Sequence, residues 1–260
     1  MIEATDITVS LGRQRILHGV DFTALPGRLN AIVGPNGSGK TTLLRALTGE
    51  VAHGGTVAIN GTDCARLAPW ELAEQRAVLP QSGALAFPFT VHEVVRLGLS
   101  GRNALGPDAE TLPARALERV GLAGYGGRYF QELSGGEQAR AQLARVLVQV
   151  WQPMVRGVPR WLLLDEPVAS LDIGHQVQIM RLAADFARAG GGVIAVMHDL
   201  NLTAMFAQSV TLMLEGRVLA AGPVGAVFTD DILGRAYGCA LRVSTPPPQG
   251  GAFVLPQAVA

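Results

Sequence analysis

The chain has 260 residues, of which 48% are hydrophobic and 16% charged, and its formal net charge is zero. This length allows one large α/β domain with an inserted subdomain. A neutral chain without a long basic run offers no electrostatic surface for nucleic acid, so we expect no such partner. No stretch approaches the roughly 18 apolar residues of a membrane span, and the N-terminus lacks the pattern of a secretory signal. We therefore expect a cytosolic protein without a span of its own, in which Cys64 and Cys239 stay reduced.

Hydrophobic patterning predicts strands alternating with helices around a parallel sheet, which is an α/β fold. The first half of the chain predicts strands within 7–22, a buried strand at 29–33, a helix at 40–47, a short helix at 69–77, a strand at 77–79, and helices over 90–150 with turns at 98–106 and 121–127. The second half predicts a buried strand at 161–164, a helix at 173–189, a buried strand at 192–197, a hairpin at 210–214 and 217–220, a short helix after 229, and a proline-rich turn at 246–248.

A glycine-rich segment joins the strand at 29–33 to the helix at 40–47. Its sequence has the spacing of a phosphate-binding loop: Gly34, Pro35, Asn36, Gly37, Ser38, Gly39, Lys40, Thr41, Thr42. Glycines let backbone N–H groups point at a phosphate, and the helix N-terminus adds positive charge. We expect Lys40 to contact the β- and γ-phosphates and the Thr41 hydroxyl to bind Mg²⁺. Lys40 is the only lysine beside 20 arginines, so lysine occurs only where a compact point charge is required.

Two acidic residues follow the buried strand at 161–164. Ligands of open α/β sheets bind at the carboxyl ends of the strands, so the strand directs Asp165 and Glu166 towards the phosphates. We expect Asp165 to hold Mg²⁺ through water and Glu166 to act as the general base for the attacking water. Acids in a solvated loop would explain their polarity but not the buried strand before them.

A second anion cradle is predicted where Ser134, Gly135 and Gly136 open a helix. One chain holds one γ-phosphate, so this cradle must serve another nucleotide. In chain order, the glycine-rich loop, this cradle and the acidic pair resemble the Walker A, signature and Walker B motifs of ATP-binding-cassette (ABC) ATPases. The resemblance covers about residues 1–230 and implies a P-loop NTPase (RecA-like) core with an N-terminal antiparallel β-subdomain and an inserted α-helical subdomain.

Further positions match this family one by one. Gln81 resembles the Q-loop glutamine that reaches Mg²⁺ and the attacking water, His198 the switch histidine at the γ-phosphate, and Asp172 the D-loop aspartate that faces the other protomer. Two positions depart from the family pattern. Leu11 stands where many members carry an aromatic residue that stacks on adenine, and Val168-Ala169-Ser170 replaces the frequent Thr-Ser-Ala.

The resemblance implies ATP and Mg²⁺ as cofactors and a two-fold homodimer with ATP between Lys40 of one copy and Ser134 of the other. Dimer closure and reopening would drive a transmembrane permease dimer at the cytoplasmic face of the bacterial inner membrane. The implied domain division is a core and β-subdomain at 1–84 and 151–230, a helical subdomain at 85–150, and a C-terminal extension at 231–260. Phe87 and Phe89 are expected at the permease-docking cleft; the alternative is that they fill the subdomain core.

The cargo follows from resemblance alone. A segment at 150–161 rich in Trp and Pro, together with His198-Asp199-Leu200-Asn201-Leu202, resembles the bacterial hemin-import ATP-binding proteins, which implies an indirect partner in a periplasmic haem-binding protein. A ferric-siderophore or cobalamin importer is the alternative, and an exporter motor or a soluble non-transport ABC ATPase is a more distant one. The remaining histidines lack metal-ligand spacing, so no haem site is expected on this chain.

Overall fold

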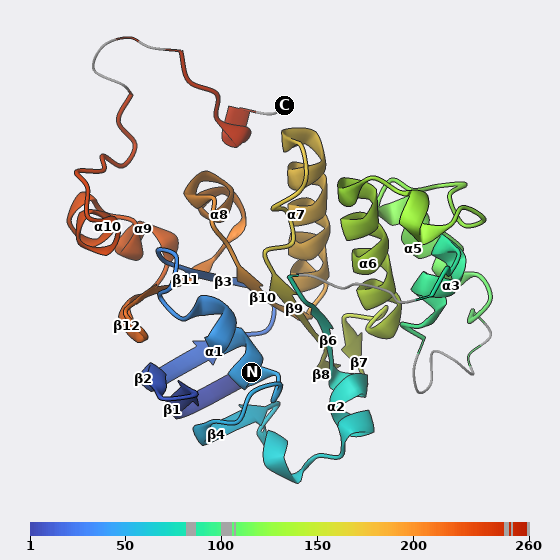
Figure 1. The fold of residues 1–260 in the computed structure, drawn as a ribbon, viewed down its shortest axis with the longest axis horizontal. Helices are drawn as coiled ribbons and strands as arrows, with labels where there is room; N and C mark the ends of the chain where they lie inside the picture. Colours follow the sequence, from blue (N-terminus) through green and yellow to red (C-terminus); the bar gives the residue numbers. More distant parts are fainter. Residues whose placement is uncertain (82–86, 100–105, 107, 247–249, 251, 259–260) are drawn as a thin grey trace.

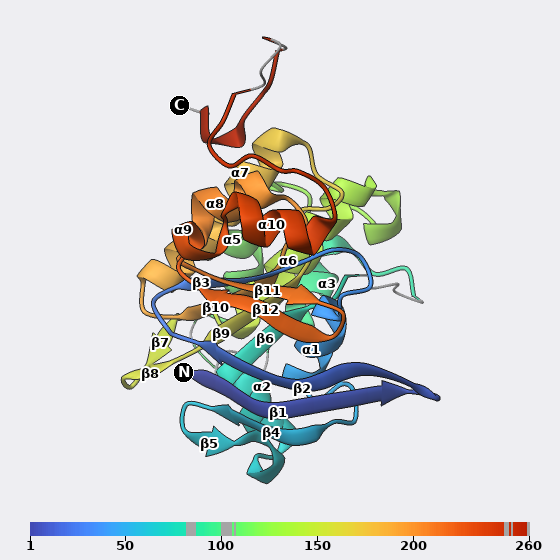
Figure 2. The ribbon, with the colours of Figure 1, turned by 90° about the vertical axis from the view of Figure 1, so that its left-hand side faces the viewer.

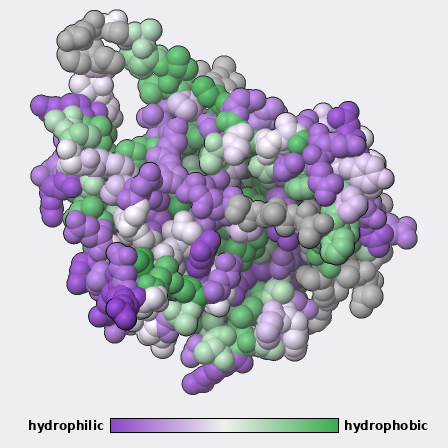
Figure 3. Space-filling view, viewed as in Figure 1, coloured by the Kyte–Doolittle hydropathy of each residue, from purple (hydrophilic) through white to green (hydrophobic). Residues whose placement is uncertain are grey.

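The computed structural model describes the 260-residue chain except for residues 82–86, 100–105, 107, 247–249, 251 and 259–260. In the described part of the chain, two larger sheets, a two-stranded hairpin sheet and the surrounding helices build the molecule (Figures 1 and 2). Among the described residues, no helix is both long and apolar enough to span a membrane. Figure 3 shows one face on which hydrophilic and hydrophobic side chains are mixed.

The N-terminal sheet is antiparallel, as the sequence predicts. Its strand order is β2-β1-β4-β5, formed by β1 (Ile2–Leu11), β2 (Gln14–Ala24), β4 (Gly54–Ile59) and β5 (Thr62–Asp63). Irregular registers interrupt the pairing of β1 with β2, which explains why the alternation at 7–22 is loose. A short 3₁₀ turn at Cys64–Arg66 leads from this sheet towards α2 (Pro69–Gln75). The sequence prediction of a helix up to residue 77 is wrong by two residues, because Arg76 already lies in a strand.

The second sheet has six strands in the order β12-β11-β3-β10-β9-β6. Its strands are β3 (Leu29–Val33), β6 (Arg76–Leu79), β9 (Trp161–Asp165), β10 (Gly192–Val196), β11 (Ser209–Leu214) and β12 (Arg217–Gly222). All neighbours pair in parallel except the edge hairpin of β11 and β12. Strands β3, β9 and β10 are buried throughout, as expected of central parallel strands covered on both faces.

Helix α1 (Lys40–Leu47) lies between the two sheets (Figure 2) and contacts β1, β2, β9 and β10. Its apolar residues join one of two hydrophobic cores, the one shared by the N-terminal sheet and the near face of the six-stranded sheet. The other core lies under the helices on the opposite face. It is covered by α7 (Ile173–Arg188), α8 (Leu200–Phe206), α9 (Val224–Val227) and α10 (Asp230–Tyr237).

Among the described residues, three helices pack on one another beside the sheet and form what we term the helical subdomain. They are α3 (Val91–Arg96), α5 (Leu112–Arg119) and α6 (Gly135–Gln149). They lie beside β6 and α7 in Figure 1. The insertion of helices into an α/β core agrees with the sequence prediction. Three predicted features lie wholly or partly outside the described residues. They are the turn at 98–106 (in part), the proline-rich turn at 246–248 (in part) and the domain boundary at 84 and 85.

The segment at 150–161 folds into a small hairpin of β7 (Met154–Val155) and β8 (Val158–Pro159). Its turn residues Arg156 and Gly157 both have positive φ, as a two-residue hairpin turn requires. Just before the hairpin, the Trp151 ring lies 4.2 Å from the guanidinium carbon of Arg119 and 5.2 Å from that of Arg115, both on α5. These cation–π contacts attach the start of the hairpin segment to the helical subdomain.

Candidate nucleotide-binding and hydrolysis site

Four neighbouring strands end at the same edge of the six-stranded sheet, and the candidate catalytic segments follow them directly. The register aligns Val196 of β10 with both Ile32 of β3 and Asp165 of β9, and Leu79 of β6 with Leu164 of β9. The glycine-rich loop, His198, Glu166 and Gln81 therefore leave the sheet side by side. This is the edge where open α/β sheets bind ligands.

A cavity of about 630 Å³ opens at this edge. Its walls are formed by residues from six segments of the chain: Leu11, Ile16, Asn36, Gly37, Gly39, Lys40, Thr41, Thr42, Gln81, Glu166 and His198. The structure thus brings together most of the residues predicted for the phosphate loop and all three predicted to be catalytic. Gly34, Pro35 and Ser38 do not line the cavity but shape the loop behind it.

Lys40 begins α1 and is 6% exposed. Its amine donates hydrogen bonds to the carbonyl oxygens of Gly34 at 2.9 Å and Pro35 at 3.0 Å, across the loop. Burial lowers the pKa of Lys40, and the nearby carboxylates of Glu166 and Asp165 oppose that effect. The amine is therefore a cation held in a partly desolvated position, where its attraction for a phosphate is stronger than in water.

The glycines of the loop occupy conformations that a side chain would oppose. Gly34, Gly37 and Gly39 all have positive φ. A Cβ at Gly34 would lie 2.2 Å from the carbonyl oxygen of Met213, and one at Gly39 would lie 2.8 Å from Leu17 Cδ2. The loop is therefore closely packed behind the cavity, and only glycine permits its path at these two positions.

Oxygen ligands for a hard cation meet beside Lys40. The Thr41 hydroxyl donates a hydrogen bond to Asp165 Oδ1 at 3.2 Å. Asp165 is 4% exposed, and burial raises the pKa of its carboxyl group above the usual value. The Ser38 hydroxyl oxygen is buried and has no hydrogen-bond partner within the described structure. A hydroxyl, a buried carboxylate and an amide oxygen from Gln81 are ligands that Mg²⁺ prefers, so the residues fit a magnesium nucleotide.

Glu166 and His198 form a direct pair on the wall of the cavity. Glu166 Oε1 lies 2.5 Å from His198 Nε2. Glu166 has a φ of 51°, in the left-handed region that is unfavourable for a residue with a side chain. Its backbone N–H donates to the Val196 carbonyl oxygen at 3.2 Å, which anchors it to β10. This strained backbone keeps the carboxylate at the cavity, and such strain often marks a functional position.

The predicted second cradle opens α6 but does not line this cavity. Ser134 caps the helix: its hydroxyl accepts from the Glu137 backbone N–H at 3.3 Å, and Glu137 Oε2 accepts from the Ser134 N–H at 2.8 Å. These bonds lower the pKa of Glu137. A Cβ at Gly136 would lie 3.3 Å from the Ser170 carbonyl oxygen, so the cradle lies next to the predicted D-loop of the same chain.

Asp172 caps α7 and is exposed. Its carboxylate accepts the His175 backbone N–H at 3.0 Å and contacts His175 Nδ1 at 2.8 Å. The bonds from the His175 N–H and ring lower the pKa of Asp172. Asp172, like Ser134 and Gly135, is thus fixed at an exposed helix N-terminus and is available to a second molecule.

Two contributors to the site, Ile16 and Gly216, were missed in the sequence, whereas Leu11 was noted there at the position of the adenine-stacking residue. Leu11, 51% exposed, and Ile16 form an aliphatic rim beside the phosphate loop. Because Ile16 belongs to a strand with loose alternation, nothing in its local pattern distinguishes it. Gly216 in the turn of the β11–β12 hairpin donates its N–H to the Ser38 carbonyl oxygen at 3.1 Å. The Glu215-Gly216 turn was visible in the sequence, but its contact with a loop nearly 180 residues earlier was not.

Comparison with known proteins agrees with this geometry. The family model described as ABC transporter matches residues 17–169, more than half of the chain. The chain belongs to the ABC transporter family. Among curated relatives, the Hemin import ATP-binding protein HmuV of Roseobacter denitrificans is 62% identical over 258 residues, which are 99% of this chain and 98% of that protein. Proteins of the same name from Jannaschia sp. and Rhizobium meliloti are 59% identical (98% of this chain, 94% of that protein) and 55% identical (99% and 98%).

Solved structures share the fold at low sequence identity. An ATP-binding cassette of an ABC transporter superposes with a TM-score of 0.78 at 23% identity, covering 91% of this chain and 98% of that chain. A bacterial Atm1-family ABC exporter with ATP bound gives 0.77 at 24% identity, covering 94% of this chain and 42% of that chain. These likenesses confirm the predicted P-loop NTPase fold with its β-subdomain and helical insertion.

Proposed function

We propose that this chain is the ATP-hydrolysing motor subunit of a bacterial haem importer. The observation that carries the proposal is the convergence of Lys40, Gln81, Glu166 and His198 on one cavity in a chain 62% identical to a hemin import ATP-binding protein. Its likeness to an exporter concerns the fold alone, so it does not favour the opposite transport direction. The alternative is a ferric-siderophore or cobalamin importer, and reconstitution with loaded binding proteins distinguishes the three cargoes.

Each part of the cavity has a proposed role in hydrolysis. The loop from Gly34 to Thr42 holds the phosphates of ATP, with Lys40 as the cation at the β- and γ-phosphates. Thr41, Asp165 and Gln81 are the residues that would hold Mg²⁺, which neutralises phosphate charge when bound. Leu11 and Ile16 offer an aliphatic surface to the adenine instead of an aromatic one.

Glu166 is the proposed general base, because its carboxylate lies on the cavity wall. From there it can accept a proton from a water that lies between it and the phosphate. His198 pairs with Glu166 through Nε2 and so fixes the direction in which the carboxylate points. We propose that His198 also contacts the γ-phosphate when ATP is present. Gln81, two residues after the end of β6, is exposed and able to reach the same water.

The exposed helix ends supply the second half of the site in a dimer. We propose that two copies associate about a two-fold axis, so that Ser134, Gly135 and Gly136 of one copy face the nucleotide held by Lys40 of the other. Asp172 lies beside that contact. ATP neutralises both faces and closes the dimer, and hydrolysis removes the bridge. Closure of the dimer drives transport only because it is coupled to a conformational change in the permease.

A transmembrane permease dimer is the proposed partner, which places the subunit at the cytoplasmic face of the inner membrane. Phe87 is 67% exposed, and its ring packs edge-on against Phe89 at 6.2 Å between centroids. Phe89 packs against the core under α3 and α6. Of the two expected roles, permease docking and filling the subdomain core, each residue takes one. We propose that Phe87 contacts the permease and that Phe89 packs in the core and supports Phe87. The proposed domain division keeps the boundaries stated from the sequence.

Reconstitution tests the cargo and the motor function together. The chain is combined with its permease in lipid nanodiscs, and ATP hydrolysis is measured with periplasmic binding proteins loaded with haem, a ferric siderophore or cobalamin. Haem-loaded protein should stimulate hydrolysis most. Stimulation by one of the other two cargoes instead would reject haem and retain the motor, whereas no hydrolysis in any arm would reject the motor itself.

A further inference from the structure

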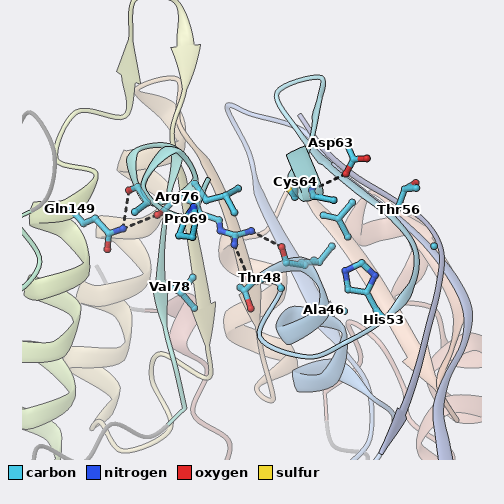
Figure 4. A pocket seen from close by; sticks show the side chains of 17 residues that line it. Ala46, Thr48, His53, Thr56, Asp63, Cys64, Pro69, Arg76, Val78 and Gln149 are labelled. Carbon is cyan, nitrogen blue, oxygen red and sulfur yellow. Dashed lines mark hydrogen bonds between the residues drawn. The ribbon is translucent and has the colours of Figure 1, made fainter. Parts of the chain in front are cut away.

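Arg76 lies between the C-terminal ends of helices α1 and α6 and forms hydrogen bonds with both. Helix α1 has 8 residues and starts at the phosphate loop, and helix α6 has 15 residues and is capped by Ser134. The two N-termini are the two anion cradles of the proposed function. Their C-terminal ends both contact Arg76, which is 9% exposed. Figure 4 shows Arg76 between the end of α1 at Thr48 and Gln149 at the end of α6.

The side chain of Arg76 holds the end of α1. Its two terminal nitrogens donate to the carbonyl oxygens of Leu47 at 2.8 Å and Thr48 at 2.6 Å. These carbonyls lack partners within the helix, and a cation at a helix C-terminus is favourable. The planar guanidinium directs two donors in parallel, which a lysine amine does not reproduce. Within the described part of the chain, Arg76 forms no ion pair with a carboxylate, so the helix end is its strongest partner.

The backbone of Arg76 holds the end of α6. The Gln149 side-chain amide donates to the Arg76 carbonyl oxygen at 2.9 Å and to the Ala73 carbonyl oxygen at 2.9 Å. Gln149 is the last residue of α6. A rotation of the helical subdomain that moves this helix end therefore pulls on the backbone at which β6 begins.

Strand β6 provides a third connection. It starts at Arg76 and ends at Leu79, two residues before Gln81 on the wall of the nucleotide cavity. The phosphate loop, the Ser134 cradle and Gln81 are thus each joined to Arg76 by one regular element. Hydrogen-bonded helices and a paired strand transmit displacement because they resist bending more than loops do.

The surroundings of this junction leave room for movement. A cavity of about 630 Å³, separate from the nucleotide cavity, lies against Arg76, Thr48 and Gln149 (Figure 4). It lies where the N-terminal sheet, α1, α2 and the helical subdomain meet. A closely packed junction would oppose small shifts of its helix ends, whereas an open space beside it does not.

We propose that Arg76 is a positioning residue that couples rotation of the helical subdomain to the phosphate loop and Gln81. This inference rests on the proposed function, because the rotation is useful only to a motor that responds to a permease. Arg76 lies outside the nucleotide cavity, and through it a movement of the α6 cradle would be accompanied by a movement of the α1 cradle.

The test separates coupling from stability by comparing two glutamines. Gln149→Met removes the amide that binds Arg76 and leaves the cap of α1 intact. Gln178→Met is the matched control, because Gln178 of α7 also reaches the helical subdomain, donating to the Arg119 carbonyl oxygen at 3.4 Å, but does not contact Arg76. Arg76→Met and Arg76→Lys complete the set. Each variant is assembled as the full chain with its permease, and thermal unfolding is recorded alongside.

The readout is the ratio of permease-stimulated to basal ATP hydrolysis, with KM for ATP determined in both states. Gln149→Met and Arg76→Met should lower the ratio about fivefold or more, Gln178→Met should leave it as in the wild type, and Arg76→Lys should lie between. If Gln178→Met lowers the ratio as much as Gln149→Met, or if neither Gln149→Met nor Arg76→Met changes it, the coupling role is refuted. A wild type that its permease does not stimulate would refute the proposed function and the coupling with it.

Discussion

Glu166 Oε1 and His198 Nε2 meet at 2.5 Å although each residue follows a different strand of the sheet. The parallel register of β9 and β10 aligns Asp165 with Val196, which places both side chains just beyond the same edge. The pair therefore depends on sheet geometry and on the left-handed backbone at Glu166. Among the residues that the structure describes, no lysine or arginine forms an ion pair with this carboxylate, so its histidine partner fixes it at the cavity.

Glu166→Gln should abolish hydrolysis while ATP binding remains. The amide has the same shape but accepts protons poorly, so turnover should fall by roughly 10²- to 10⁴-fold. Because the proposed dimer reopens only after hydrolysis, ATP and Mg²⁺ should then hold two copies together. Phosphate release measures the first effect and size-exclusion chromatography the second. Rapid turnover by this variant would remove Glu166 as the base.

Lys40→Ala should weaken ATP binding by roughly 10- to 100-fold, because a charge-assisted contact with phosphate is lost. Titration with a fluorescent ATP analogue measures the change, and circular dichroism verifies the fold. Lys40→Arg is the matched control for charge alone. At a position that is 6% exposed, the larger guanidinium should not restore binding. Unchanged affinity in Lys40→Ala would contradict the assignment of the phosphate site.

Asp165→Asn should stabilise the isolated subunit and abolish its activity. Burial raises the pKa of Asp165 above the unfolded value of 3.8, so the folded state binds the proton more tightly than the unfolded state. The stability contributed by this carboxyl group is therefore fully present below pH 3.8 and is lost as the pH rises through the raised value. At neutral pH the ionised carboxylate disfavours folding, and asparagine removes that cost.

Thermal unfolding without nucleotide or Mg²⁺, between about pH 5 and pH 8, measures the Asp165 effect. The Asn variant should have the higher Tm at neutral pH, by roughly 2–4 °C for each kcal/mol gained, and the difference should shrink as the pH falls. A lower Tm, or a difference that does not change with pH, would show that ionised Asp165 is not disfavoured by burial.

Phe87→Glu should reduce permease-stimulated hydrolysis and leave Tm unchanged, because the side chain is 67% exposed. Phe89→Glu is the comparison, since Phe89 packs against the hydrophobic core and a charge there should lower Tm. Measuring hydrolysis and unfolding for both variants separates contact with the permease from support of the fold. Normal stimulation in Phe87→Glu would exclude it from the contact surface.

The elements predicted most accurately are those whose local signals are strong. The uninterrupted apolar run at 161–164 identified β9, a mostly apolar run at 29–33 identified β3, and the glycine-rich loop located the start of α1 at Lys40. Strand β4 was missed, because it begins with Gly54 and Gly55, and glycine is depleted in strands. The hairpin at 154–159 carried an Arg156-Gly157 turn signal between valines that was not used.

The cavity was predictable to the extent that each segment carries its own motif. Lys40, Glu166 and His198 were identified in this way, and the structure brings them together. Arg76 was not identified, because a single arginine at the start of a short strand has no distinctive pattern. Its importance comes from contacts with residues 28 and 73 positions away, and such distances are decided by the assembled fold.

Gly216 belongs to the phosphate site although it lies in the β11–β12 turn, which carries no nucleotide-binding motif. It accepts the His18 backbone N–H at 3.1 Å and donates to Ser38, and a Cβ there would lie 1.9 Å from the Ile16 carbonyl oxygen. With φ at 71°, the position excludes every larger residue on two separate grounds. A mutational scan that measures growth on haem as the iron source should find Gly216 as intolerant of substitution as Gly34. Natural variants at this turn should therefore be expected to impair the nucleotide site, as variants of the phosphate loop do.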